Sequence, residues 1–463
     1  METYHLAVDL GATSGRTILA VFDGKKLTLE EVSRFTHPML PLAGHIFWNL
    51  PELYNQILAA LERVAARSIK LSSIGIDTWG CDVAYFNADG TLAGLPYCYR
   101  DPHTEGAMDR FASKMSLEEL YERTGIQFMD FNTVFQLDTI KPTADRILFM
   151  PDALAYMLTG NAVCEYTVAS TSQLLNPRTG DLDEHILGAF GLSRTKFGPM
   201  VRPGEVIGTL TKQVAEYTGL GEVPVIAVAG HDTASAVIGV PSEGDDYAYL
   251  SCGTWSLLGV ESPDAIITDE ARRYNFTNEG GIDGTTRFLK NICGMWLFEQ
   301  ARKEFVDAPS DVASLAALCA VSDCDSIIDP DDASFAHPAS MTAAIAAYCA
   351  RNRQRVPETP ADFVRVIFRS LADKTGQVLG RLRELSPVEI NRLHVIGGGS
   401  RNAYLMQMFA DTLGLPVVAG PAESTALGNA LVQLLGCGLV SSQAQMRHIS
   451  RRSISTVTYN PEK

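Results

Sequence analysis

A glycine-bearing turn between two apolar runs occurs twice in this chain, and it constrains the fold more than any other feature. The first copy lies around Gly11 in residues 5–20, and the second lies around Gly253 in residues 247–261. An apolar run, a small polar turn and a second apolar run predict a β-hairpin. Two such hairpins, far apart in the chain, predict two similar half-domains that hold a polyphosphate between them.

The first turn also carries groups that could bind a ligand or take part in a reaction. Its backbone N–H groups and the Thr13 hydroxyl can bind an anion, as Thr254 can in the second turn. Asp9 lies in an apolar strand, where a carboxylate is disfavoured and costly to bury unpaired. A magnesium ion or its water would offset that cost, and Arg16 would then meet a transferring phosphoryl group. The alternative is an ordinary hairpin in which Gly11 only supplies a positive φ.

A lone aspartate stands between the two hairpins, where a strand meets a helix. The apolar run 225–229 ends at Gly230, and Asp232 opens a stretch of small residues. An aspartate in this place is commonly a helix N-cap. With a phosphate-binding turn on each side, the same carboxylate is a candidate general base, and the two roles are compatible.

Two further segments combine strands with unusual residues. Residues 393–399 run from a short strand into three consecutive glycines, which bring bare backbone close to a flat or anionic ligand. The alternative is a tight strand–helix joint. Residues 77–82 break an apolar strand with Asp77, Trp79 and Asp82, a mixture that suits sugar recognition because hydroxyls bind carboxylates and C–H faces stack on the indole.

Length, charge and cysteine content limit the class of protein. At 463 residues the chain exceeds a single core, so two domains are expected, with a boundary in the Gly/Pro/Asp-rich stretch 239–246. The net charge of −16 argues against nucleic acid or an anionic membrane as a partner. Nine scattered cysteines without a CxxC pair favour free thiols in a reducing cytoplasm over a zinc site. No signal peptide and no membrane span are expected.

Periodicity predicts the main helices and strands. Asn49 is expected to cap a helix with Pro51 in its first turn, and this helix would bury Leu53, Ile57 and Leu61. Helical patterns dominate from residue 117 to residue 158. The expected strands and later helices are the strands 6–10, 17–22, 27–35, 73–77, 83–86, 205–210, 223–229, 393–396 and 416–419, and the helices 360–382, 402–413 and 426–435.

Segments along most of the chain together resemble the FGGY family of carbohydrate kinases, within the actin- and hexokinase-like superfamily. The resemblance implies an α/β fold with two ribonuclease-H-like domains around a central cleft. Residues 1–242 would form the sugar-binding domain and residues 243–463 the nucleotide-binding domain. The segments that carry the resemblance are residues 7–16, 73–80, 94–101, 125–128, 131–133, 230–237, 250–256, 276–281, 289–292 and 393–399.

The resemblance implies a role for each matching residue. ATP and Mg²⁺ are the implied cofactors, and Asp232 would take the proton from the attacking hydroxyl. Apart from the resemblance, the place of Asp9 in an apolar strand makes it the expected metal ligand. The residues implied to hold ATP are Ala12, Thr13, Ser14, Gly15, Arg16, Thr254 and Gly398, and those implied to hold the sugar are Gly80, His231, Asp232, Thr233 and Asn291.

One position departs from the family pattern. Glu299 stands where a glutamine is expected to face the nucleotide, and a carboxylate there would repel phosphate unless Gln300 takes its place or Glu299 faces away. The implied reaction is ATP-dependent phosphorylation of the primary hydroxyl of a ketose, with L-rhamnulose favoured. Another ketose, L-fuculose or D-xylulose, or a non-catalytic sugar or nucleotide sensor are the alternatives. A cytoplasmic monomer or small homo-oligomer is expected.

Overall fold

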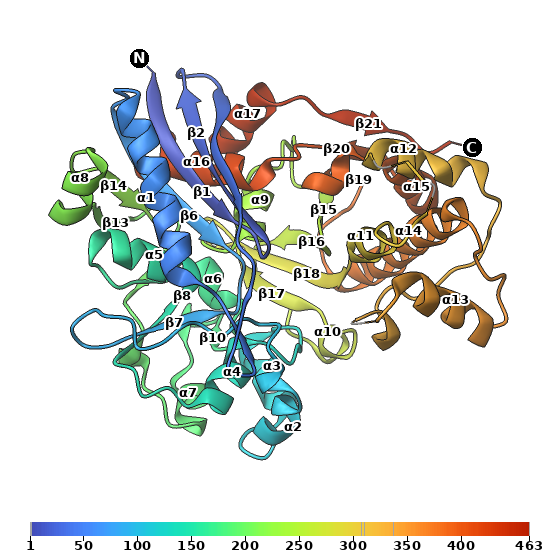
Figure 1. Ribbon diagram of the computed structural model, residues 1–463, viewed down its shortest axis with the longest axis horizontal. Coiled ribbons are helices and arrows are strands. Elements are labelled where there is room, and N and C mark those ends of the chain that lie inside the picture. Colours follow the sequence, from blue (N-terminus) through green and yellow to red (C-terminus); the bar gives the residue numbers. More distant parts are fainter. Residues whose placement is uncertain (1, 307, 310, 337, 463) are drawn as a thin grey trace. The chain divides into compact units, whose positions relative to one another are not determined.

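The chain forms two compact units that are not continuous in sequence (Figure 1). The structure is a computed structural model, and it describes residues 2–306, 308–309, 311–336 and 338–462. The predicted division at 242/243 stays a prediction, and the contacts group the chain differently. The first unit comprises Met1–Pro241, Ser262–Phe288 and Ser424–Ser453, and the second comprises Ser242–Glu261, Leu289–Glu423 and Ile454–Lys463.

A six-stranded sheet organises the first unit. Its central hairpin pairs β1 with β2 in antiparallel register, and Gly11 N donates to Ser14 O across the turn at 3.0 Å. Strand β6 runs parallel to β1 on the other side. The strand order is β13 (Val206–Thr209), β14 (Pro224–Ile226), β6 (Leu71–Thr78), β1 (Thr3–Leu10), β2 (Ser14–Phe22) and β3 (Leu27–Thr36).

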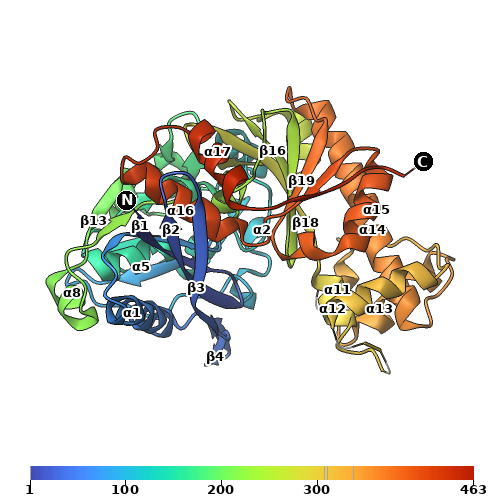
Figure 2. The ribbon, with the colours of Figure 1, turned by 90° about the horizontal axis from the view of Figure 1, so that it is seen from above.

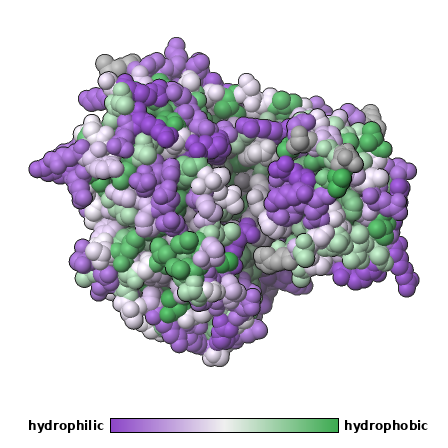
Figure 3. Space-filling view, in the orientation of Figure 1, coloured by the Kyte–Doolittle hydropathy of each residue, from purple (hydrophilic) through white to green (hydrophobic). Residues whose placement is uncertain are grey.

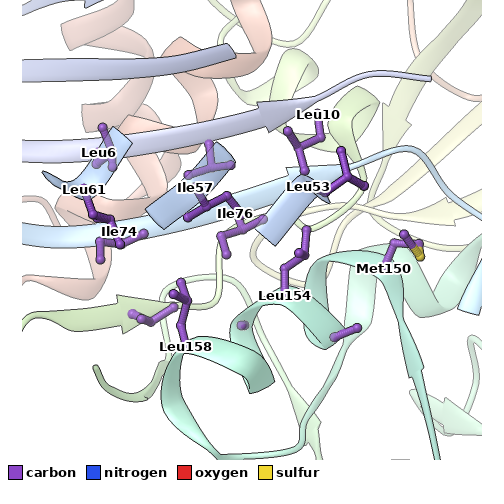
Figure 4. Packing of buried hydrophobic residues seen from close by; sticks show 14 of the residues in the cluster. Leu6, Leu10, Leu53, Ile57, Leu61, Ile74, Ile76, Met150, Leu154 and Leu158 are labelled. Atoms are coloured by element: carbon purple, nitrogen blue, oxygen red, sulfur yellow. The ribbon is translucent and has the colours of Figure 1, made fainter. Parts of the chain in front are cut away.

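One face of this sheet packs on helices α1 (Leu50–Ala66) and α5 (Met150–Thr159). The Asn49 side chain accepts from Glu52 N at the start of α1, with a proline in the first turn, as the sequence predicts. Figure 4 shows side chains of β1 and β6 meeting those of both helices. The labelled core residues are Leu6, Leu10, Leu53, Ile57, Leu61, Ile74, Ile76, Met150, Leu154 and Leu158.

The opposite face of the same sheet receives a helix from the far end of the chain. Helix α16 (Ser424–Gly436) contacts β1 and β6 and packs against α9 (Asp232–Ile238). In Figures 1 and 2, α16 and α17 (Gln443–Ser453) lie beside the blue strands β1 and β2. Glycine permits this approach, because a Cβ on Gly428 would lie 1.7 Å from Ser235 O.

A second sheet organises the second unit, and it again has an antiparallel hairpin beside a parallel strand. Strand β15 pairs with β16 in antiparallel register and with β19 in parallel register. The strand order is β17 (Thr277–Gly280), β18 (Thr286–Cys293), β16 (Trp255–Ser262), β15 (Tyr247–Cys252), β19 (Arg392–Ile396), β20 (Val417–Ala419) and β21 (Val457–Tyr459). Of these strands, β17 and residues 286–288 of β18 are grouped with the first unit. The helices of this unit are α11 (Trp296–Ala301), α12 (Val312–Ala317), α13 (Met341–Arg351), α14 (Pro360–Leu385) and α15 (Ala403–Leu413).

Shorter elements complete the first unit. They are β4 (Leu40–Leu42), β5 (His45–Phe47), β7 (Val83–Phe86), α2 (Ala107–Phe111), α3 (Leu117–Thr124), α4 (Thr133–Ile140), β8 (Arg146–Phe149), β9 (Cys164–Glu165), α6 (Tyr166–Ser170), β10 (Leu175–Asn176), β11 (Asp181–Leu182), α7 (Glu184–Ala189), β12 (Met200–Val201), α8 (Lys212–Thr218) and α10 (Asp269–Arg273).

Most predicted elements are confirmed, and two predictions are wrong in detail. The helical stretch 117–158 is interrupted by strand β8, which pairs with β7. The strand expected over 223–229 is only β14, because the chain leaves the sheet after Ile226 to reach α9. All nine cysteines are free, and only Cys81 and Cys437 are not buried.

The visible surface is mostly hydrophilic. Figure 3 shows charged and polar residues over much of this face, with smaller hydrophobic patches among them. In the part of the chain that the structure describes, no helix is long and apolar enough to cross a membrane.

We expect Gly428→Ala to destabilise the protein. The new methyl group would meet the Ser235 carbonyl oxygen at 1.7 Å, which forces α16 away from α9. Overpacking of this kind costs about 1–3 kcal/mol or more. Gly380→Ala is the matched control, because Gly380 is an exposed position in α14 with open space around its Cβ. That change should stabilise by about 0.5–1 kcal/mol, as alanine does in helices. Urea unfolding of both variants tests the contrast, and equal effects would contradict it.

Candidate functional site

The ends of strands β1 and β6 and the start of helix α9 gather the candidate residues of the first unit. Asp9 and Asp77 are register partners on the two parallel strands, so their side chains leave the sheet on the same face. Beyond β6, Thr78 N donates to Gly230 O at 2.9 Å, and Thr78 forms an isolated bridge with His231. This pairing brings the residues before α9 to the same end of the sheet.

The turn between β1 and β2 presents its polar groups outward. Thr13 and Ser14 are exposed and Ala12 is partly exposed, whereas Gly15 is buried. A Cβ on Gly15 would meet the Phe35 ring at 2.5 Å, so a side chain at this position would displace the neighbouring strand. The turn therefore has the open backbone and hydroxyl groups that an anion-binding loop requires.

Asp9 forms an ion pair that the sequence analysis did not foresee. Arg16 is its cross-strand partner, and Nε and Nη2 of Arg16 lie 2.8 and 2.7 Å from Asp9 Oδ2. The expectation of an unpaired carboxylate at Asp9 is therefore wrong. Arg16 already compensates the charge of Asp9 without a metal, and removing Asp9 would leave the partly exposed guanidinium without this partner.

Asp77 belongs to a buried chain of hydrogen bonds. Asn429 Nδ2 donates to Asp77 Oδ2 at 2.6 Å, and Gln433 Nε2 donates to Asn429 Oδ1 at 2.7 Å. Ser73 Oγ in turn donates to Gln433 Oε1, and His5 Nδ1 lies 2.7 Å from the same hydroxyl. All five side chains have 0 % exposure. Burial, and next the charge of Asp9, raises the pKa of Asp77 well above its ordinary value.

Asp82 is occupied by the protein itself. Its carboxylate accepts from the indole N–H groups of Trp48 and Trp79 at 2.5 and 2.9 Å, from Tyr99 N at 3.1 Å and from Gln136 Nε2 at 2.8 Å. Burial raises its pKa to about 6, against the opposing effect of these donors. Asp82 and Asp77 both have 0 % exposure, so neither carboxylate can meet a sugar hydroxyl, and the expectation that they bind the sugar is wrong.

Gly80 lies between these two aspartates, at a sharp bend. A Cβ on Gly80 would meet Thr171 Oγ1 at 2.7 Å, and that hydroxyl accepts from Cys81 N at 3.0 Å. Cys81 has a φ of 71°, which is unusual for a residue other than glycine. Strain of this kind is commonly found at binding sites, where the backbone must turn sharply beside a ligand.

Asp232 is the first residue of α9, and His231 is the N-cap. The Asp232 carboxylate accepts from Thr233 Oγ1 at 3.2 Å and lies 3.5 Å from His231 Nε2. Burial raises its pKa above the ordinary 3.8, while the nearby His231, Thr233 and Arg287 oppose the rise. The side chain keeps 28 % exposure, so a substrate hydroxyl can reach it.

His231 has two contacts that sequence reasoning missed. Arg287 Nη2 lies 3.1 Å from His231 Nδ1, and Glu279 Oε2 lies 3.2 Å from the same nitrogen. Both partners come from the strand pair β17–β18. The segment 276–281 contributes only to the family resemblance, and no local signal in the sequence marks Glu279 or Arg287 as neighbours of His231.

In the second unit, the turn after β15 packs under a glycine. Gly294 N donates to Thr254 O at 3.2 Å, and a Cβ on Gly294 would lie 2.5 Å from Gly253 O. Thr254 is exposed at the tip of the turn, and Asn291 is half-buried on β18 just before this contact. The second hairpin thus offers a hydroxyl and backbone groups, although its turn is one residue shorter than the first.

The three glycines after β19 differ in whether the structure requires a glycine at their position. Gly397 has a φ of 83°, and a Cβ on Gly399 would meet Cys252 Sγ at 2.3 Å. Gly398 has neither constraint: it is exposed, and nothing lies within 4 Å of the Cβ position. Backbone conformation therefore explains Gly397 and packing explains Gly399, whereas the middle glycine is left open to a ligand.

Glu299 on α11 forms an ion pair with Arg302, the residue that caps the end of the same helix. Its carboxylate lies 2.7 Å from Arg302 Nη2, and Lys303 Nζ donates to Gln300 Oε1 at 3.3 Å. The ion pair reduces the repulsion that an isolated carboxylate would exert on a phosphate. Glu299 and Gln300 both remain candidates for a nucleotide contact.

Comparison with known proteins identifies relatives along the whole chain. Residues 4–239 match the N-terminal domain of the FGGY family of carbohydrate kinases, and residues 248–437 match the C-terminal domain. A rhamnulokinase from Bacteroides thetaiotaomicron is 51% identical over 472 residues, which cover 100% of this chain and 96% of the relative. A rhamnulokinase from Pectobacterium atrosepticum is 42% identical over 98% of this chain and 92% of its own.

Solved structures of sugar kinases have the same fold. A gluconate kinase from Lactobacillus acidophilus superposes with a TM-score of 0.84 at 14% identity, covering 100% of this chain and 94% of that one. A glycerol kinase from Plasmodium falciparum, solved with ADP, gives 0.80 at 16% identity, covering 99% of this chain and 94% of that one. The predicted two-domain α/β fold of the actin and hexokinase type is confirmed.

We expect Asp82→Ala to destabilise the first unit strongly. The change leaves two indole N–H groups and Gln136 without their buried acceptor. Each unsatisfied donor costs about 1–3 kcal/mol, so the variant should lose at least about 3 kcal/mol. Asp82→Asn should lose less, because the amide oxygen can still accept from both indoles. Urea unfolding followed by circular dichroism measures both, and a stable alanine variant would contradict the assignment.

Proposed function

This chain belongs to the FGGY family of carbohydrate kinases, and we propose that it transfers the γ-phosphoryl group of ATP to the primary hydroxyl of L-rhamnulose. The product would be L-rhamnulose 1-phosphate. The observation that carries this choice of sugar is the similarity of the entire chain to several rhamnulokinases, at 38% to 51% identity.

Asp232 is the general base in this proposal. Its carboxylate combines partial exposure with a pKa raised above the ordinary 3.8, and both properties suit a group that accepts a proton from a hydroxyl. As the O–H proton passes to Asp232, the hydroxyl oxygen attacks the γ-phosphorus and the bond to the bridging oxygen of ADP breaks. The loose transition state makes positioning and charge compensation the main tasks of the protein.

Nucleotide contacts are proposed in each unit by itself. Ala12, Thr13, Ser14, Gly15 and Arg16 are proposed to hold the phosphates, and the exposed hydroxyls and open backbone of this turn support that role. In the second unit, Thr254, Gly398 and Glu299 are proposed to contact the nucleotide. The unconstrained Gly398 supports this, because it offers backbone that can approach a flat ligand closely.

The sugar would be held by Gly80, His231, Asp232 and Thr233 of the first unit and by Asn291 of the second. The halves 1–242 and 243–463 are proposed as the sugar-binding and nucleotide-binding domains. The free cysteines fit a reducing compartment, so we place the enzyme in the cytoplasm, as a monomer or small homo-oligomer.

A magnesium ion is proposed to accompany ATP. Mg²⁺ keeps several waters and takes only one or two protein carboxylates, so Asp9 together with phosphate oxygens would suffice. When bound, the ion neutralises charge on the phosphates during transfer. Arg16 pairs with Asp9 across the hairpin and is thus held where it can also meet a phosphate oxygen.

The central test compares ATP-dependent phosphorylation of L-rhamnulose, L-fuculose and D-xylulose. We expect kcat/KM to be highest for L-rhamnulose, and phosphorus NMR to show phosphate on the primary carbon. A preference for another ketose would overturn the choice of sugar. If ATP binds but no ketose is phosphorylated, the chain is a sensor instead.

Asp232→Asn should fold normally and bind both substrates while turnover falls by about 10²–10⁴, the usual loss for a general base. In the wild type, kcat should fall on the acid side, because protonation removes the base. The raised pKa places this loss above the ordinary 3.8. Near-normal turnover in the folded variant would exclude Asp232 as the base.

Gly398→Val should weaken ATP binding and leave sugar binding unchanged. The branched side chain enters space that no protein atom occupies within 4 Å, so the fold itself should tolerate it. Gly221→Val is the control, since Gly221 has equally open surroundings in the first unit. Calorimetry on both variants measures the effect. Unchanged ATP affinity would make the glycine run a structural joint only.

Asp9→Asn should raise the free Mg²⁺ concentration needed for half-maximal rate at fixed Mg·ATP. The amide is a weaker ligand than the carboxylate, and it also weakens the pairing with Arg16. Arg16→Gln is the control, because it removes the ion pair and keeps the carboxylate. An Asp9→Asn enzyme with unchanged metal dependence, and with calorimetric Mg·ADP affinity equal to the wild type, would place the metal elsewhere.

A further inference from the structure

The imidazole of His231 is held by a buried ion pair that none of the proposed roles uses. Arg287 has 1 % exposure and Glu279 has 5 %. Their side chains meet at 3.0 Å between Nη2 and Oε2, and both approach the same nitrogen, Nδ1, of His231. Glu279, Arg287 and His231 all belong to the first unit, so this cluster lies within one compact body.

The ion pair is itself anchored. Arg287 Nε donates to Gly280 O at 3.0 Å. The backbone of Gly280 is itself fixed, because Gly280 N donates to Ser170 Oγ at 2.7 Å. A Cβ on Gly280 would lie 2.5 Å from the Tyr166 ring, so β17 sits tightly on α6. The guanidinium therefore approaches His231 from a fixed direction.

The backbone before His231 is fixed by the same helix. Glu165, the N-cap of α6, accepts from Gly230 N at 2.9 Å, and His231 N donates to Thr167 Oγ1 at 3.3 Å. Backbone and ring are thus both tied to neighbours of α6, and the ring has little freedom to turn.

Hydrogen-bond roles follow from chemistry. A guanidinium is always protonated and can only donate, so Nδ1 accepts from Arg287 only when it carries no proton. The alternative is that Nδ1 carries the proton and donates it to Glu279. Among the described residues, no donor has acceptable hydrogen-bond geometry toward Glu279 Oε2, although His231 and Arg287 lie close. In a neutral ring, the proton is then on Nε2.

We propose that Arg287, held by Glu279, is a positioning residue that fixes His231 as the Nε2–H tautomer and directs this N–H toward Asp232 and the substrate hydroxyl. Nε2 lies 3.5 Å from Asp232 Oδ1, which is longer than a good N–H···O hydrogen bond. The N–H is therefore available to the oxygen of a hydroxyl that lies against both groups. This role rests on the proposed function, in which that hydroxyl belongs to the sugar.

This tautomer gives His231 and Asp232 different roles toward the substrate hydroxyl. With Nδ1 turned to Arg287 and Nε2 protonated, His231 presents no acceptor to the substrate. The proton of the attacking hydroxyl can pass only to Asp232, while His231 donates to the same oxygen. Although burial raises it, the charge of Arg287 holds the pKa of Glu279 below its ordinary value, so the ion pair stays charged.

The primary test is nitrogen NMR of the protein labelled in its histidine rings, recorded without sugar or nucleotide. The His231 signals are assigned by their loss in His231→Asn. We expect an unprotonated Nδ1 and a protonated Nε2 in the wild type and in Glu279→Gln. In Arg287→Met, the buried Glu279 carboxylate loses its cation, and we expect the ring proton to move to Nδ1.

A wild-type ring with its proton on Nδ1 would overturn the proposal. If Arg287→Met does not fold, the wild type and Glu279→Gln decide the question alone. Because this measurement needs no substrate, it is independent of the sugar: a correct tautomer without L-rhamnulose kinase activity would refute the proposed function and leave the assignment of the tautomer intact.

Kinetics separates positioning from mere stability. Losing a directed hydrogen bond should reduce kcat/KM for the sugar about 10- to 100-fold in Arg287→Met while the KM for ATP stays unchanged. Arg287→Lys, which restores a donor and a charge, should recover part of the loss. Equal damage to both substrates, or no rescue by lysine, would show that Arg287 only supports the fold.

Discussion

The packing of helix α16 against α9 and against the β1–β6 face is the contact on which the geometry of the first unit depends. The Cβ position of Gly428 lies 1.7 Å from Ser235 O, so any larger residue would separate the two helices. Ser424 Oγ donates to Ala236 O across 188 residues of sequence, and Gln433 Nε2 reaches Leu6 O on β1. Because α9 begins with Asp232, the residue proposed as the base is positioned by a helix from the far end of the chain.

Asp77 at the end of β6 and Asp82 in the segment just beyond it show that two buried carboxyl groups close in sequence can have very different hydrogen-bond partners. Asp82 has four donors on its carboxylate, which is close to the capacity of the group. Asp77 has Asn429 on one oxygen, while its other oxygen has no hydrogen-bond partner among the described residues. An incompletely satisfied carboxyl beside Asp9 costs stability. Such costs are commonly retained beside functional sites, where stability is not the only requirement.

Local sequence was sufficient for the hairpins, the cap of α1 and the glycine run, because these depend on neighbours along the chain. The Asp9–Arg16 pair was within reach of the same reasoning. Once the hairpin turn is placed at residues 11–14, the register makes residues 9 and 16 partners, and opposite charges at partner positions attract. The Arg16 guanidinium therefore compensates the buried charge of Asp9 without a metal.

Other features depend on residues too distant to pair by pattern. Asn429 reaches Asp77 over 352 residues, and Arg287 reaches His231 over 56. Neither Glu279 nor Arg287 stands out in its segment, because an alternating polar residue on a strand usually faces solvent. Only the fold shows that these two side chains are buried. The roles of the site residues are a separate matter, since they depend on ligands as well as on the fold, and they stay predictions.

The carboxylates of the first unit differ in whether an arginine contacts them, and therefore in how readily they accept a proton. Asp9 is paired with Arg16, and Glu279 is paired with Arg287 at 3.0 Å. Asp232 has no arginine in direct contact among the described residues, and burial raises its pKa. A proton acceptor benefits from that difference, because a carboxylate tightly bound to a guanidinium holds a proton poorly. Arg287 is near enough to orient His231, yet its charge is already committed to Glu279. The histidine lies between this ion pair and the base, so the arginine directs a hydrogen bond through the ring. The charge of Arg287 lowers the pKa of Asp232, but by less than burial raises it.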